Sequence, residues 1–213
     1  LDASSIDAGI LGLNDLGTNG DLLADDLVFS AAAVIPQTSR GVKQLSFVAT
    51  DAQGRAGFGD ITMRVLPPAS ENDTCAGAIT IPSQGPFPYA SAPVDVQGNN
   101  PAPELAMCAD GRYTAWYSFT PARASFYECS TCDADAPGCT VPDTVMAVYA
   151  GACGSLNQIA CVDDGGCGLR ALVRPVNALE PGQTYYIQVG KPLAALPADA
   201  LSSISLAEHE LPP

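Results

Sequence analysis

The cysteines of this chain are confined to one part of it. Eight cysteines lie between residues 75 and 167, and the first 74 residues contain none. An even set at varied spacings is typical of a disulfide framework, which persists only in an oxidising compartment. The sequence therefore predicts an exported protein in which these residues form disulfides: Cys75, Cys108, Cys129, Cys132, Cys139, Cys153, Cys161 and Cys167.

The charge balance excludes several classes of partner. The chain has 213 residues and a net charge of −14. Nucleic acid and anionic membranes are bound by clustered Lys and Arg, so neither is an expected partner. No segment approaches the roughly 20 apolar residues that span a bilayer, so membrane insertion is not expected either. We predict a secreted, extracellular or cell-surface protein, either a mature product or an excised segment.

Short alternating or apolar runs, separated by Gly, Pro, Asn and Asp, predict an all-β chain. The expected strands are residues 27–35, 44–50, 58–66, 113–120, 124–131, 144–149, 157–162, 169–176, 184–189 and 201–207. Such spacing is typical of sandwiches and barrels. Because Pro67 and Pro68 stiffen the chain and stop strand pairing, we predict two β-sandwich domains, 1–67 and 68–213.

The first domain resembles a bacterial immunoglobulin-like sandwich. The resemblance rests on NDLGTNGDLLADDLVFSAAAVIP followed by VKQLSFVATDAQGRAGFGDITMRV, and it covers most of residues 7–66. A complete immunoglobulin sandwich has about 100 residues, so this domain is short. We expect it to lack its first strands.

The second domain resembles the bacterial pre-peptidase C-terminal domain, a jelly-roll-like β-sandwich attached to secreted proteins. The matching stretches follow in order over most of residues 71–190 and read ENDTC, WYSFT, DT with AVY, CVDD and TYYIQVG. The resemblance implies a non-catalytic accessory or surface module. In some members the Glu-Asn-Asp stretch chelates calcium, which implies the same role for Glu71, Asn72 and Asp73.

Cysteine spacing suggests two of the disulfides. Cys153 and Cys161 flank a short loop between two expected strands, a separation that a hairpin can close. Cys75 and Cys108 are placed to staple the start of the second domain to a neighbouring strand. The remaining four cysteines allow three connectivities, and spacing does not choose among them.

A zinc site is the competing interpretation of the cysteines. Cys129-Ser-Thr-Cys132 has finger-like spacing, and four thiolates would suffice. The spacing lacks a matching second pair and falls within an expected strand. Disulfides are therefore favoured over a metal or redox site.

Oxygen-rich turns predict calcium, which takes six to eight oxygen ligands. The first candidate site is a glycine-containing loop with Asn14, Asp15, Asn19, Asp21, Asp25 and Asp26. A solvated Asx-rich turn is the competing interpretation of that loop. The second candidate site joins Glu71, Asn72 and Asp73 to three carboxylates near strand ends, Asp143, Asp163 and Asp164.

Asn72-Asp73-Thr74 is also the one N-x-S/T sequon of the chain. Glycosylation there requires an exposed loop and a suitable export pathway. A glycan and a calcium ion on Asn72 exclude each other, and we favour the metal.

Aromatic residues recur in the expected strands of the second domain, namely Trp116, Tyr117, Phe119, Phe126, Tyr127, Tyr149, Tyr185 and Tyr186. We expect most of them to fill a sandwich core. Strand periodicity turns one member of each adjacent pair outward. A carbohydrate-stacking face is therefore the alternative.

Nothing in the sequence favours catalysis. The single histidine, His209, lies near the C-terminus, and no GxSxG or HExxH motif is present. The Asp residues suit turns and cations better than glycoside hydrolysis. We predict a protein that is not an enzyme and has no organic cofactor.

The predicted function is structural, as part of an extracellular or cell-surface assembly rigidified by disulfides and calcium. A sandwich short of strands exposes its edges, and a strand accepted from another copy would join copies into a filament. The alternative is a glycan- or substrate-binding accessory module of a larger secreted hydrolase. The expected partners are other copies of the chain, further domains of a parent chain, or glycans.

Overall fold

The computed structural model describes residues 1–36, 40–50, 52–101, 104–165, 167–175, 177–192 and 200–209. Apart from two short 3₁₀ helices, η1 (Ser4–Ile6) and η2 (Cys75–Gly77), the regular structure of these residues is β-strand. The predicted all-β class is confirmed. Within the described residues, no helix has the length and apolar character needed to cross a membrane.

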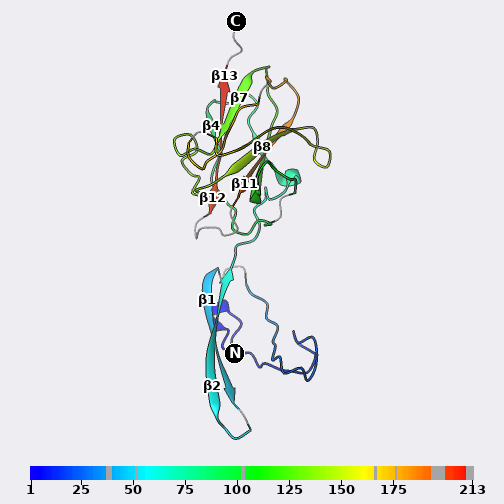
Figure 1. The fold of residues 1–213 in the computed structure, drawn as a ribbon, viewed down its shortest axis with the longest axis vertical. Coiled ribbons are helices and arrows are strands. Elements are labelled where there is room, and N and C mark those ends of the chain that lie inside the picture. Colours follow the sequence, from blue (N-terminus) through cyan, green and yellow to red (C-terminus); the bar gives the residue numbers. More distant parts are fainter. Residues whose placement is uncertain are drawn as a thin grey trace. The chain divides into compact units, whose positions relative to one another are not determined.

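The chain divides into two compact units, Leu1–Pro67 and Pro68–Pro213. Unit 1 is built on one antiparallel hairpin of β1 (Gly41–Thr50) and β2 (Ala56–Val65), which form a two-stranded ribbon (Figure 1). One face of the hairpin carries Leu45, which packs in a small core with Ala3 and Ile6. The register places Leu45 opposite Ile61 and leaves Val48 opposite Phe58 on the other face.

The predicted strand at residues 27–35 is not formed. Ser30 is the one residue of this segment that makes a β-bridge, and its partner is Asn14. The two residues exchange backbone N–H···O bonds of 2.9 and 3.0 Å. A strand forms only where a neighbour supplies a continuous ladder, and here Asn14 supplies a single bridge.

Unit 2 contains two larger sheets and one small sheet (Figure 1). The five-stranded sheet has the order β3-β6-β11-β8-β9, the four-stranded sheet has the order β10-β7-β13-β4, and β12 pairs with β5. The strands are β3 (Ile79–Ile81), β4 (Tyr89–Ala90), β5 (Val94–Asp95), β6 (Arg112–Phe119), β7 (Phe126–Ser130), β8 (Val145–Ala150), β9 (Asn157–Asp163), β10 (Leu172–Val173), β11 (Tyr185–Lys191), β12 (Leu201–Ser202) and β13 (Ser205–His209).

Most expected strands of this unit are present within a few residues of their predicted bounds. The strand expected at 169–176 is reduced to β10, and residue 176 lies outside the described residues. The strand expected at 201–207 is divided into β12 and β13. The sequence does not predict β3, β4 and β5, because two or three residues show no measurable alternation.

The main core of unit 2 lies between the two larger sheets. Tyr117 of β6 and Ile187 of β11 come from the five-stranded sheet, and Tyr127 of β7 comes from the four-stranded sheet. The rings of Phe119 and Tyr127 meet edge to face with centroids 4.8 Å apart, and Phe87 contacts both. These aromatic side chains therefore join the sheets, as expected for a sandwich core.

The opposite face of the five-stranded sheet is also buried. Trp116 of β6 packs there in a second cluster with Cys75 and Tyr149, and its ring lies 5.6 Å from that of Tyr149. Leu105 and Met107 pack against this cluster. The chain before β6 thus covers a sheet face that would otherwise expose an indole to water.

Two disulfides fasten this cover. Cys75–Cys153 and Cys108–Cys161 link positions 78 and 53 residues apart, each joining the chain before β6 to the β8–β9 hairpin. Loops of this length contribute roughly 4 kcal/mol each in the chain-entropy model. The cover is therefore held covalently as well as by packing.

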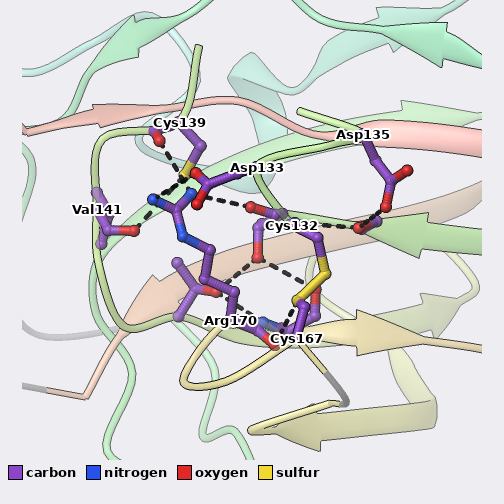
Figure 2. Close-up of a disulfide and its surroundings, with 11 residues drawn as sticks. Cys132, Asp133, Asp135, Cys139, Val141, Cys167 and Arg170 are labelled. Atoms are coloured by element: carbon purple, nitrogen blue, oxygen red, sulfur yellow. Dashed lines mark hydrogen bonds and ion pairs between the residues drawn. A yellow bond between two sulfur atoms is a disulfide. The ribbon is translucent and has the colours of Figure 1, made fainter. Parts of the chain in front are cut away.

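The third disulfide, Cys132–Cys167, joins the loop after β7 to the loop before β10 (Figure 2). Arg170 reinforces this junction by donating to two backbone carbonyls of the first loop, at 2.9 and 3.0 Å. The guanidinium also pairs with Asp133 at 3.0 Å, and Figure 2 shows the Arg170 side chain reaching from near Cys167 toward Asp133 and Cys139.

These pairings correct the two disulfides suggested by spacing. Cys153 does not pair with Cys161, and Cys75 does not pair with Cys108. Cys153 lies in the β8–β9 turn, whereas Cys161 lies four residues into β9. Four residues of strand extend roughly 13 Å, too far for one disulfide to close the hairpin.

Cys129 and Cys139 are free and buried, so the prediction that all eight cysteines form disulfides is wrong. Cys129 points into the main core, where burial raises the pKa of its thiol to about 12. The zinc alternative is also wrong, because Cys132 is bonded to Cys167. Cysteine is among the most buried residue types even without a partner, which a spacing argument ignores.

We predict that the unfolded, unreduced protein takes up two thiol labels, at Cys129 and Cys139, because the other six cysteines are bonded. Reduction before labelling should raise the number to eight. The folded protein should take up none, since both thiols are buried. Intact mass after alkylation measures all three numbers, and an absence of labels on the unreduced, unfolded chain would show a fourth disulfide.

Candidate functional site

A group of three carboxylates lies at one end of the β8–β9 pair. Asp143 precedes β8, Asp163 ends β9 opposite Val145, and Asp164 follows directly. One carboxylate oxygen from each lies within 4.8 Å of the others. Because β8 and β9 are antiparallel, the start of one and the end of the other meet at the same end of the sheet. The structure thus brings together the three carboxylates predicted to meet at strand ends.

The charges of this trio oppose one another. Burial, followed by the charges of Asp163 and Asp164, raises the pKa of Asp143 above its usual value. Burial and the charge of Asp164 raise the pKa of Asp163 as well. Oδ1 of Asp143 is buried and has no hydrogen-bond partner among the described residues. A buried, unpaired carboxylate oxygen costs free energy, which a cation would recover.

Lys191 is the nearest basic contributor to this trio. It ends β11, is 3% exposed, and its charge works against the raised pKa of Asp143. Burial lowers the pKa of Lys191, while Asp143 raises it. The single ammonium of Lys191 does not neutralise three ionised carboxylates, so the group keeps a net negative charge. The donor set therefore fits a divalent, oxygen-seeking cation.

The second trio lies in unit 1 and consists of Asp15, Asp21 and Asp26, whose nearest oxygens also lie within 4.8 Å of one another. Backbone N–H groups already occupy several of these oxygens. Gly17 N donates to Asp21 Oδ2 at 2.7 Å, and Asp15 accepts from the N–H groups of residues 26 and 27 at 3.1 and 3.0 Å. Of the predicted carboxylate ligands of this loop, Asp25 is not part of the trio, and Oδ1 of the predicted ligand Asn14 already accepts from Leu16 N at 3.2 Å. The loop matches the competing interpretation of an Asx-rich turn as well as it matches a metal site.

Glu71 and Asp73 do not group with the carboxylates at the end of β8 and β9, so the structure does not bring together the full set predicted for the second calcium site. Asn72 instead exchanges bonds with β6, since its Nδ2 donates to the Trp116 carbonyl at 3.0 Å and its own carbonyl accepts from Trp116 N at 2.8 Å. Asp73 accepts from the backbone N–H of Asn100 at 3.1 Å. This stretch fastens the start of unit 2 to the edge of β6.

Glycosylation of Asn72 is contradicted by its burial. The residue is 1% exposed, and Nδ2, the atom that would carry the glycan, donates to a backbone carbonyl. A glycan needs an exposed side chain. The sequon is therefore a by-product of a structural asparagine.

The aromatic residues of unit 2 do not form an exposed platform. Trp116, Tyr117, Phe119, Tyr127, Tyr149 and Tyr185 are buried, and Phe126 and Tyr186 are partly buried. Core packing is confirmed for the first six. The glycan-stacking face predicted as an alternative has no exposed member in this set.

His209 lies at the end of β13 and is exposed, with Nε2 3.9 Å from Glu128 Oε2. Glu208, the preceding residue of β13, accepts hydrogen bonds from Tyr127 and Arg123, and the bond with Arg123 holds the pKa of Glu208 below its usual value. Arg123 and Glu208 form an ion pair at 2.6 Å. Ser125 Oγ donates to the backbone carbonyl of His209 at 2.8 Å rather than to its imidazole.

An apolar surface on unit 1 was not identified from the sequence. The described residues include fifteen exposed large apolar side chains, and fourteen of them belong to unit 1. We call this set the apolar surface of unit 1, and it comprises Ile10, Leu13, Leu16, Leu22, Leu23, Leu27, Val28, Phe29, Val34, Val42, Val48, Phe58, Ile61 and Leu66. Fourteen such side chains in one unit of 67 residues leave much apolar surface in contact with water, and extensive exposed apolar surface marks interaction sites. The sequence feature that could have indicated this apolar surface is the short length of the domain.

We predict that Asp143→Asn stabilises unit 2 near neutral pH when divalent cations are chelated. A raised folded-state pKa means that the folded unit binds the proton more tightly, so ionisation lowers stability as pH rises above 3.8, the usual value, and through the raised pKa. Each 1 kcal/mol relieved should raise Tm by about 2–4 °C.

Melting curves in chelator from pH 3 to 7 test this. The higher Tm of Asp143→Asn should disappear at the acidic end of the range, because the wild-type Asp143 carboxyl is protonated there in both the folded and the unfolded state. Glu180→Gln, at an exposed carboxylate of the same unit, is the control and should leave Tm unchanged. Equal Tm of wild type and Asp143→Asn across the range would contradict the prediction.

Comparison with known proteins identifies no family. No family model matches the chain, and no curated protein matches it. Among solved structures, a chain described under "Structural basis for the promiscuous specificity of the carbohydrate-binding modules from the beta-sandwich super family" is 12% identical, with coverage of 81% of this chain and 75% of that chain and a TM-score of 0.28. That TM-score is too low to support an argument about fold or function.

Proposed function

We propose that this protein is a non-catalytic structural subunit of an extracellular or cell-surface assembly. In this proposal unit 2 is the rigid body, and unit 1 joins copies of the chain. The observation that carries it is the uneven distribution of exposed apolar side chains, fourteen on unit 1 and one on unit 2 among the described residues. Association removes such surface from water, which is favourable by roughly 25 cal/mol per Å².

The stability of unit 2 supports this division of roles. Its core is buried on both faces of the five-stranded sheet, and three disulfides tie its loops together. Disulfides persist in oxidising compartments, which supports export. The resemblance of unit 2 to pre-peptidase C-terminal domains fits a surface module without catalysis, and that of unit 1 to an immunoglobulin-like sandwich fits an interaction domain.

We expect the wild-type chain to self-associate and Phe58→Lys to prevent it. Phe58 is 80% exposed on β2, and a buried ammonium would oppose any contact there. Leu169→Lys is the matched control, because Leu169 is the exposed large apolar residue of unit 2. Light scattering after size-exclusion chromatography should show species well above 21.8 kDa for wild type and Leu169→Lys.

Two outcomes would contradict this proposal. A wild-type chain that stays at the monomer mass at high concentration would remove self-association altogether. Equal loss of association in Phe58→Lys and Leu169→Lys would show a nonspecific effect of added charge rather than an interface on unit 1.

We further propose that the trio Asp143, Asp163 and Asp164 binds calcium. Three carboxylates, one of them with a buried oxygen that lacks a hydrogen bond in the described part of the chain, supply the hard oxygen donors that Ca²⁺ prefers. The ion would screen the mutual repulsion of the trio. Its contribution would be structural, by holding the ends of β8 and β9 together.

Calcium should raise the Tm of unit 2 relative to the protein in EGTA. Native-state binding stabilises by about 2.7 kcal/mol when the free ion is at 100 times Kd, which corresponds to roughly 5–10 °C. Asp163→Asn should remove most of the response, whereas Glu71→Gln should keep it, since Glu71 lies outside the trio. A wild-type Tm that is the same in calcium and EGTA would rule out the ion.

A further inference from the structure

We propose that residues 27–35 of one copy add as an antiparallel strand to the outer edge of β2 in a second copy. This proposal rests on the proposed self-association and names its donor and its acceptor. The donor is the segment LVFSAAAVI, which forms no strand within the described chain. The acceptor is the edge of β2 that faces away from β1.

The donor segment has the properties of a strand without a partner. It is rich in apolar residues, and most of its side chains are exposed, with Val34 at 90% and Leu27 at 82%. Ile35 at its end is partly buried against the core of its own unit, a contact that strand addition would exchange. The Ser30–Asn14 bridge is its one β-contact in the described structure. Leaving that bridge gives up two backbone hydrogen bonds, whereas pairing over nine residues would form a continuous ladder.

The acceptor edge is open. β1 occupies one side of β2 over its full length, and no strand or bridge adjoins the other side among the described residues. The outer edge of β1 differs, because Asp2 bridges to Ser46 there, with Asp2 N donating to Ser46 O at 2.7 Å. A two-stranded sheet is marginal alone, so a third strand on β2 is the addition that stabilises it.

One register continues the core face of unit 1. With Leu27 opposite Val65 and Ile35 opposite Gly57, the apolar positions of the donor extend the face on which unit 1 packs its core. On the other face the register sets Ser30 opposite Thr62 and Val34 opposite Phe58, and it sets Val28 and Ala32 opposite the charged Arg64 and Asp60.

The close packing at Gly59 agrees with this register. Phe47 lies over Gly59, where an added Cβ would meet the ring at 2.4 Å. The register sets Ala33, whose side chain is one methyl group, opposite Gly59. Charge agrees as well, since Asp26 just before the donor comes beside Arg64 of β2.

Chain length requires the donor to come from a second copy. In this register Ile35 lies at the Gly57 end of β2, but the same chain must start β1 at Gly41, opposite Val65. Eight residues along the strands and two strand spacings separate these points by roughly 28 Å. The six Cα–Cα steps from Ile35 to Gly41 span at most about 22 Å. A chain therefore cannot place this strand on its own β2.

Each copy carries one donor and one acceptor, so the contact is heterologous. Reciprocal exchange between two copies closes as a strand-swapped dimer, whereas one-way addition closes into a larger ring or extends as a filament. The mass measured by light scattering separates the dimer from the larger assemblies.

Disulfide trapping between two singly substituted chains tests the proposal. Unit 1 has no native cysteine and the two free thiols of unit 2, Cys129 and Cys139, are buried, so Ser30→Cys in one chain and Thr62→Cys in another each introduce one exposed or partly exposed thiol. Opposite residues of an antiparallel pair have Cα atoms about 4.5–5.5 Å apart, within disulfide reach. Mixing the two full-length chains under mild oxidation should give a covalent heterodimer, with residues 30 and 62 joined in the peptide map.

Gln44→Cys provides the matched control acceptor. Gln44 pairs with Thr62 across the hairpin and shares its face and exposure, but it lies one strand further from the donor. It should give only background cross-linking with Ser30→Cys. Equal trapping by Gln44→Cys and Thr62→Cys would overturn the register.

The outcomes separate this inference from the proposed function. Chains that self-associate in light scattering but give no 30–62 link would overturn the strand addition and leave self-association standing. Chains that stay monomeric would overturn both. A 30–62 link that forms only within one chain, in the Ser30→Cys/Thr62→Cys double variant and never between mixed chains, would overturn the intermolecular pairing.

Discussion

Burial of the outer face of the five-stranded sheet is the constraint on which the rest of unit 2 depends. Trp116 places an indole on that face, so the sheet needs a cover on both sides. The chain before β6 provides it, beginning with the two hydrogen bonds that the side chain and backbone of Asn72 make with the backbone of Trp116 and continuing through the parallel pairing of β3. Short loops have little apolar surface of their own, and Cys75–Cys153 and Cys108–Cys161 compensate by constraining the unfolded chain.

Unit 1 buries only part of its apolar surface. Its hairpin covers one face with a small core around Leu45, while the other face shows Val48 and Phe58 to solvent. No covalent bond substitutes for the missing contacts, since this unit has no cysteine. Under the proposed self-association, a partner copy would complete the burial that unit 1 lacks, whereas unit 2 buries its core within itself. That difference is the physical basis for assigning the contacts between copies to unit 1.

Local patterns in the sequence predicted the longer strands but not the features that depend on tertiary contacts. β6, β8 and β11 alternate or run apolar over enough residues to be recognised, whereas β4 and β5 are two residues long. The strand expected at 27–35 has the right composition, but a strand also needs a partner edge, which composition does not reveal.

The candidate sites were likewise predictable only where local sequence determines the contact. The proximity of Asp143 and Asp163 could be predicted because they flank antiparallel strands. The role of Asn72 in binding the backbone of β6 could not be recognised, because its sequence motif is also a glycosylation sequon. The predicted disulfide pairs were wrong because Cys161 bonds to Cys108, 53 positions away, rather than to the preceding cysteine in the sequence.

Under the proposed export, the order of the disulfides along the chain would set when unit 2 is able to fold. All three N-terminal partners, at 75, 108 and 132, precede all three C-terminal partners, at 153, 161 and 167. No native disulfide would form until residue 153 had crossed, by which time five other thiols would have entered the oxidising compartment. Mispaired thiols would then need exchange to reach the native pairing. Maturation of unit 2 would therefore be late, dependent on thiol–disulfide exchange, and preceded by the emergence of the unit to which we assign the contacts between copies.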